Sequence, residues 1–140
     1  MARRYGITCA LMLTTFALGL SIGQLPKLTA QTSDRVVEVR TYTAAEGKLD
    51  ALAKRMGTDE RKFFEKYGMK SVLYSVAADP PLSQNTFVYI LSHQSREAAK
   101  KSWASVLQDP EFKSLIERTG RLSTKAEVMF LKPTDYSPVQ

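Results

Sequence analysis

The sequence predicts an α+β domain, in which a four-stranded antiparallel sheet carries two helices on one face. Four segments alternate apolar and polar residues with a period of two, and two longer segments repeat with a helical period. Their order along the chain is βαββαβ. Of the 140 residues, 44% are hydrophobic and 24% are charged, which is ordinary for a globular protein. We therefore expect a single domain over residues 31–140.

Residues 36–42 are predicted to form the first strand, because they are rich in β-branched residues and alternate. Glu38, Arg40 and Tyr42 share one face of it. The first helix begins after Gly47 and ends at Gly68, with apolar residues near helical spacing between them. Gly57 predicts a kink there, since glycine weakens a helix interior by about 1 kcal/mol.

Residues 70–77 alternate again and predict the second strand, which ends at Asp79 and the two prolines after it. Residues 86–93 predict the third strand. Its two faces are both mostly apolar, which is typical of a central strand.

The second helical region begins at Ser95, a favoured N-cap residue, and its predicted inner stripe is Ala99, Trp103, Val106 and Leu107. The pair Asp109-Pro110 restarts the helix, which continues to Gly120. Residues 125–131 predict the fourth strand.

With both helices on one face, the other face of the sheet is left uncovered. Three of the four strands offer apolar or large residues on both faces. An exposed apolar sheet of that size usually meets a partner, so we expect a homodimer that closes two sheets face to face.

The first 30 residues are predicted to be a signal peptide and linker. Arg3 and Arg4 precede an uncharged apolar run over residues 7–22, and small residues suited to cleavage follow at 21–23 and 28–30. A retained anchor is the alternative, because residues 7–25 are just long enough to span a bilayer. We expect a secreted or periplasmic protein that meets a membrane only if this segment is not cleaved.

Charge and cysteine content exclude several classes of function. The net charge is +6 for the whole chain, but over residues 31–140 seventeen cationic residues face fourteen acidic ones in interleaved order, as in Asp59-Glu60-Arg61-Lys62. Nucleic acid is therefore not expected as a partner. The single cysteine, Cys9, lies in the signal segment, so the domain has no disulfide, no thiolate nucleophile and no cysteine-ligated metal.

Several short segments together resemble the NIPSNAP family over about residues 36–138. They are Glu38-Val39-Arg40-Thr41-Tyr42-Thr43, Gly47-Lys48-Leu49-Asp50, Phe64-Glu65-Lys66-Tyr67-Gly68-Met69, Trp103 with Asp109-Pro110-Glu111-Phe112, and Leu131-Lys132-Pro133-Thr134-Asp135-Tyr136-Ser137-Pro138. The resemblance implies ferredoxin-like subunits that pair through their sheets as a dimeric α/β barrel.

The resemblance supplies no common reaction. It implies structural kinship with cofactor-independent monooxygenases and haem-degrading enzymes, which bind small molecules between sheet and helices. The chain departs from many members of the family in the first helix, where Asp59 and Tyr67 stand in place of two histidines. No histidine chemistry is carried over through these two positions, and no cofactor is expected.

We predict that Arg40, Tyr42, Tyr74, His93 and Trp103 bind a ligand. Arg40 would fix an anionic or carbonyl group, with Glu38 orienting it; the alternative is an internal Glu–Arg pair that supports packing. His93, the only histidine, would be a general base or ligand contact at the rim of a pocket, or else a partly exposed residue at the strand end. Trp103 and the tyrosines would line the pocket or simply pack in the core.

Three functions follow from these observations. The first is a homodimer that binds a small apolar or aromatic molecule between sheet and helices. The second is an enzyme like the cofactor-independent monooxygenases, and the third is a structural or interaction module. No residue is assigned a catalytic role, and a lone histidine does not form a two-histidine metal site.

Overall fold

The computed structural model describes residues 34–139. The predicted signal peptide and its linker lie outside the described residues. The elements in chain order are β1 (Val36–Ala44), α1 (Leu49–Arg55), η1 (Met56–Glu60), α2 (Arg61–Lys66), β2 (Lys70–Val76), η2 (Leu82–Gln84), β3 (Thr86–His93), α3 (Arg96–Gln108), α4 (Pro110–Thr119) and β4 (Ser123–Leu131).

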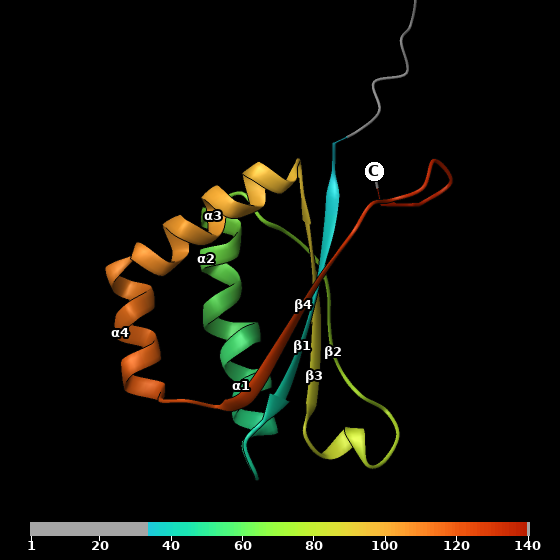
Figure 1. Cartoon of the computed structure of the whole chain (residues 1–140). Coiled ribbons are helices and arrows are strands. Elements are labelled where there is room, and N and C mark those ends of the chain that lie inside the picture. Colours follow the sequence, from blue (N-terminus) through green and yellow to red (C-terminus); the bar gives the residue numbers. More distant parts are fainter. Residues whose placement is uncertain (1–33, 140) are drawn as a thin grey trace, which may run out of the picture. The chain divides into compact units, whose positions relative to one another are not determined.

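The four strands form one antiparallel sheet in the order β2-β3-β1-β4. The helices α1 to α4 all lie on one side of this sheet (Figure 1). This confirms the predicted α+β class and the ferredoxin-like order of elements. The strands that contain Glu38 and His93 are the two central ones, and Arg40 of β1 is paired with Tyr89 of β3 and Val128 of β4.

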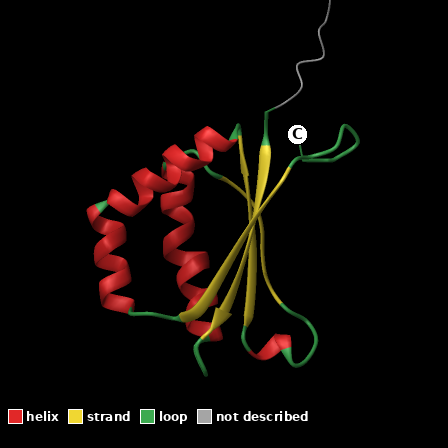
Figure 2. Cartoon of the chain, viewed as in Figure 1, coloured by secondary structure: helices red, strands yellow, loops and turns green. Residues whose placement is uncertain are grey.

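The first helical region is interrupted where Gly57 predicted a kink. The five residues of η1 form a π-helical turn between two α-helical segments. Figure 2 shows the region as one stretch of helix beside the sheet. Leu52, Met56, Glu60 and Phe64 are spaced by four and are all buried. In a regular α-helix a stripe with this spacing drifts around the axis, because one turn holds 3.6 residues. The wider π turn offsets the drift, so Glu60 stays on the inner face.

The joint between α3 and α4 follows from capping chemistry. Ser95 accepts a hydrogen bond from the Ala98 backbone amide and so caps α3. Asp109 accepts bonds from the amides of Glu111 and Phe112, with proline at the next position, and so starts α4. The prediction of Leu107 in the inner stripe is wrong: its side chain is 59% exposed. Val106 takes the inward position, and adjacent helical residues point in different directions.

The core lies between the helices and the sheet. Its centre is Tyr89, which stacks on Phe64 and Tyr74 with ring centroids 5.8 Å and 5.9 Å away. Phe64 is fully buried, whereas Phe63 is only partly buried. The helical face of the sheet is thus filled mainly by aromatic residues.

The opposite face of the sheet carries exposed apolar side chains. Leu73, Met129 and Leu131 are 46%, 55% and 44% exposed. The strand registers place them on the same face as Val39 and Ile90, away from the helices. No helix among residues 34–139 has the length and hydropathy needed to cross a membrane.

Candidate functional site

The carboxylate of Glu38 forms the centre of a buried polar cluster. The residue is 0% exposed. Its Oε1 accepts a hydrogen bond from Arg40 Nε at 2.6 Å, and its Oε2 accepts one from Trp103 Nε1 at 2.8 Å. His93 Nε2 lies 2.7 Å from the same Oε2. One carboxylate therefore joins β1, β3 and α3.

Hydrogen bonding keeps this carboxylate charged. Burial alone would raise the pKa of Glu38, but the bonds from His93 and Trp103 and the positive charge of Arg40 outweigh burial and lower it. A charged Glu38 in turn holds Arg40 in place. The guanidinium of Arg40 also stacks on Trp103, with its Cζ 3.8 Å from the ring centroid.

A cavity of about 620 Å³, which we call the inner cavity, lies next to this cluster. Its walls come from the sheet and from the helices. The apolar lining consists of Tyr42, Trp103, Leu107, Phe112, Ile116, Leu122 and Ala126. The polar lining includes Arg40, Arg55, Glu60, Glu117, Arg121 and Ser123. A mostly apolar pocket with a few convergent polar groups is the usual form of a small-molecule site.

Arg40 and Trp103 also line a second hollow, of about 470 Å³, which we call the α3 cleft. Glu38, Arg96 and Phe130 belong to its walls, and the Arg96 guanidinium lies 3.5 Å above the Phe130 ring. The stacked pair of Arg40 and Trp103 therefore contributes to both hollows.

Sequence reasoning missed two residues of the inner cavity, Arg55 and Glu60. They form a buried ion pair in which Arg55 Nε and Glu60 Oε1 are 2.7 Å apart. Arg55 Nη1 also donates to Thr119 Oγ1 and to the Gly120 carbonyl, at 2.9 and 3.0 Å. In the sequence Glu60 stands among exposed charges. One pattern in the sequence does indicate its burial: Glu60 lies four residues from both Met56 and Phe64, which are buried apolar residues.

Tyr42 lies on the wall of the inner cavity with its hydroxyl 3.2 Å from that of Tyr89. Tyr89 is fully buried, and burial raises the pKa of its hydroxyl well above the ordinary value. The Tyr89 hydroxyl thus remains neutral, and the two rings form part of an aromatic wall.

Of the five predicted site residues, Arg40, Tyr42 and Trp103 line the inner cavity. Tyr74 and His93 do not line it. Tyr74 stacks on Tyr89, and its hydroxyl lies 2.8 Å from Ser71 Oγ. The alternative of a partly exposed His93 is wrong, because the side chain is 2% exposed beneath Phe130 and bound to Glu38.

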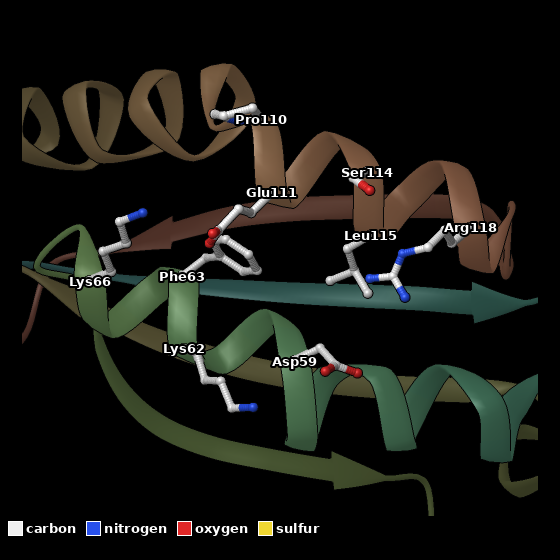
Figure 3. A pocket seen from close by; sticks show the side chains of 9 residues that line it. All are labelled: Asp59, Lys62, Phe63, Lys66, Pro110, Glu111, Ser114, Leu115 and Arg118. Carbon is white, nitrogen blue, oxygen red and sulfur yellow. The ribbon is translucent and has the colours of Figure 1, made fainter.

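A further hollow of about 570 Å³ lies between α2 and α4 and is shown in Figure 3. Phe63 and Leu115 point into the gap between the helices, whereas Lys62 points away from α4. Lys66 at one end is held by Asp109, 2.7 Å away. The charges around this groove are mixed, and no predicted site residue belongs to it.

Metal ligands are not grouped in the part of the chain that the structure describes. No set of three or more histidine, cysteine, aspartate or glutamate side chains there could hold an ion. The polar groups that line the inner cavity are guanidinium, carboxylate and hydroxyl groups of its arginine, glutamate, tyrosine and serine residues.

Comparison with known proteins gives a consistent result. The NIPSNAP family model matches residues 37–138. The chain is similar to an uncharacterised NIPSNAP-like domain protein from Burkholderia xenovorans, with 19% identity and a TM-score of 0.68 over 76% of this chain and 90% of that one. It is similar to a NIPSNAP family protein of unknown function from Agrobacterium tumefaciens, with 24% identity and a TM-score of 0.67 over 76% and 94%.

A more distant likeness is to SnoaB, a cofactor-independent oxygenase from Streptomyces nogalater. The identity is 18% and the TM-score 0.52, over 75% of this chain and 98% of that one. At these identities the likeness shows the fold. Comparison with curated proteins gives no match.

Proposed function

Because this chain belongs to the NIPSNAP family, whose fold it shares, we propose that it binds a small, mostly apolar or aromatic molecule in the inner cavity. The ligand carries an anionic or carbonyl group that meets Arg40. The observation that carries the proposal is the position of Arg40 in an apolar wall, fixed there by Glu38 and Trp103.

Arg40 is suited to this role because only part of its guanidinium is used. Its Nε donates to Glu38, and no other hydrogen bond from its side chain is formed within residues 34–139. Guanidinium nitrogens bind carbonyl and carboxylate oxygens well because they form a planar set of donors. The surrounding Tyr42, Trp103 and Phe112 supply flat apolar contacts for an aromatic body.

A fluorescent aromatic anion, 8-anilinonaphthalene-1-sulfonate, tests the proposal. Loss of one charged hydrogen bond costs about 1.5–3 kcal/mol, so Arg40→Ala should weaken binding by about 10-fold or more. Ile116→Trp, which fills the cavity without touching Glu38, should block binding. Arg118→Ala in the groove of Figure 3 is the matched control and should bind as the parent does. Unchanged affinity in Ile116→Trp and in the double variant Arg40→Ala/Tyr42→Ala would refute the site.

A second candidate is an enzyme of the cofactor-independent oxygenase kind. It is supported by the fold likeness to SnoaB and by a tyrosine hydroxyl, that of Tyr42, on the cavity wall. Oxygen uptake with a panel of quinols, lost in Tyr42→Phe, would favour it. Absence of uptake across the panel would count against it.

We further propose that a second copy of the chain covers the open face of the sheet and that the protein is exported. The dimer is supported by the exposed Leu73, Met129 and Leu131 on that face, and export by the signal-like pattern of residues 1–30. Native mass spectrometry of protein recovered from its own envelope fraction reports processed mass, subunit number and retained ligand together. A monomer at full mass would contradict both statements, and a dimer without added mass would favour an interaction module.

A further inference from the structure

Glu60 is a buried carboxylate that faces the inner cavity and is not needed to explain ligand binding. The residue is 4% exposed, lines the cavity, and is placed there by the π-helical turn. Burying a carboxylate is costly unless it is fully paired and hydrogen-bonded. The structure shows only part of that compensation.

The ion pair with Arg55 is close, but it leaves acceptor capacity free. Arg55 Nε lies 2.7 Å from Glu60 Oε1, but its N–H is not directed at that oxygen, and neither atom has another hydrogen-bond partner within residues 34–139. Arg55 directs its Nη1 toward α4 instead. No donor among these residues bonds to the second oxygen of Glu60, although a carboxylate has about four acceptor sites. The carboxylate is therefore available to a donor that enters the cavity.

The surroundings make this carboxylate more basic than an ordinary glutamate. Burial raises the pKa of Glu60. The charge and close approach of Arg55, together with the charge of Arg40, offset this only in part. Asp59, next to it in η1, raises the pKa further. Tyr74 and Tyr89 of the sheet are the other titratable groups that sense its charge. A carboxylate with these properties in a cleft is a candidate for proton transfer.

The other carboxylates nearby lack these properties. Glu38 is held by three donors, lines the α3 cleft rather than the inner cavity, and has a lowered pKa. Glu117 lines the inner cavity but is exposed to solvent. Glu60 alone among the described glutamates combines burial, a free acceptor and a place on the wall of the inner cavity.

We propose that Glu60 is a general base that removes a proton from a molecule bound in the inner cavity. The proposal rests on the proposed function, since it requires a ligand in that cavity. A C–H or O–H bond of the ligand breaks, the proton goes to the Glu60 carboxylate, and the electron pair stays on the ligand. The negative charge, delocalised onto an oxygen, faces Arg40. The substrate class is thus a small apolar molecule with an acidic proton and an oxygen that accepts the charge.

The probe for this proposal is 5-nitrobenzisoxazole, a flat and mostly apolar carbon acid. A base removes the C–H proton of its isoxazole ring, the C=N bond becomes a nitrile, the N–O bond breaks, and a coloured cyanonitrophenolate forms. No oxidant or cofactor is needed. The parent protein should catalyse this elimination faster than an equal concentration of acetate at the same pH.

Glu60→Gln should lower kcat/KM by about 100-fold or more, since positioned general bases contribute roughly 10²–10⁴. Glu65→Gln, at an exposed position of α2 outside the inner cavity, is the matched control and should keep the parent rate. In the parent, kcat/KM should rise with pH around a midpoint above the ordinary glutamate value of about 4.3, because the deprotonated form is active. This pH profile needs no variant, so it tests the proposal even if Glu60→Gln does not fold.

Displacement of 8-anilinonaphthalene-1-sulfonate separates failure of the base from failure of the site. Displacement by 5-nitrobenzisoxazole without elimination by the parent would refute the role of Glu60 while leaving ligand binding intact. An unchanged rate in Glu60→Gln would also refute it. If the dye binds but the probe neither displaces it nor reacts, the role of Glu60 is refuted and the binding site stands. If the dye does not bind and the probe does not react, both proposals fail.

Discussion

Replacement of Glu38 by glutamine tests the central claim about the buried cluster. Glutamine has nearly the same shape, but it carries no charge and offers a single acceptor oxygen. Arg40, His93 and Trp103 now share two carboxylate oxygens. In the variant at least one of these three partners loses its bond while remaining in place.

The expected cost follows from the geometry. A hydrogen bond to a charged group contributes about 1.5–3 kcal/mol, and removing one partner from a buried ionic cluster costs about 3–5 kcal/mol. We therefore expect the free energy of unfolding to fall by about 3–5 kcal/mol at neutral pH, where a domain has only about 5–15 kcal/mol in total. At about 4 °C or more per kcal/mol, the midpoint of thermal unfolding should fall by at least roughly 12 °C.

The dependence on pH identifies the cause. The pKa of Glu38 is lowered in the folded protein, so its contribution is present above the ordinary pKa and is lost as pH falls through the lowered one. The difference between parent and variant should therefore shrink below about pH 4.

Urea unfolding, followed by circular dichroism, measures the effect. Glu46→Gln, at an exposed position, is the control and should stay within about 0.5 kcal/mol of the parent. A loss below 1 kcal/mol, or a loss that does not change on acidification, would show that the carboxylate does not hold the cluster together.

Three further predictions concern single elements. Gly57→Ala should raise stability by about 0.5–1 kcal/mol in urea unfolding, because a Cβ there meets no atom within 4 Å and alanine favours the helix; a loss would show that η1 needs glycine. Trp103→Phe keeps an aromatic ring at this position but loses the indole N–H that bonds to Glu38, and it should cost about 1.5–3 kcal/mol in the same assay; no loss would show that Trp103 does not contribute to the cluster. Asp109→Ala should lower the thermal midpoint more than Asp109→Asn, which keeps the cap of α4 but loses the charge that holds Lys66. The hydrogen bond from Lys66 is the largest cause of the lowered pKa of Asp109, so the loss in Asp109→Asn should vanish in strong acid, and equal midpoints for the two variants would argue against capping.

Most of the fold could be predicted from the sequence, because strands and helix starts depend on residues that are close together in the chain. Alternation predicted the third strand with the bounds that it has, Thr86–His93. Ser95 and Asp109 predicted where α3 and α4 begin, since both residues cap through their own side chains. The strand alternation also placed Glu38, Arg40 and Tyr42 on one face, which is the face that meets the helices.

The partners of these residues could not be predicted, because they come from distant parts of the chain. Glu38 is 55 residues from His93 and 65 from Trp103. No local sequence pattern predicts that His93, at the end of a strand, is buried against Glu38. The strand pairing and the packing of α3 decide it.

The position of Glu60 was decided mainly by tertiary structure, although its four-residue spacing from Met56 and Phe64 gives a weak signal in the sequence. Its neighbours along the chain are charged, so the local sequence favours exposure. A π-helical turn and the fixed Arg55, which is anchored to Thr119 of α4 and to Gly120 just after it, bring it inward. Local periodicity determines which segments become strands and helices; where a charged side chain finally lies depends on the groups that solvate it, and those are assembled only by the fold.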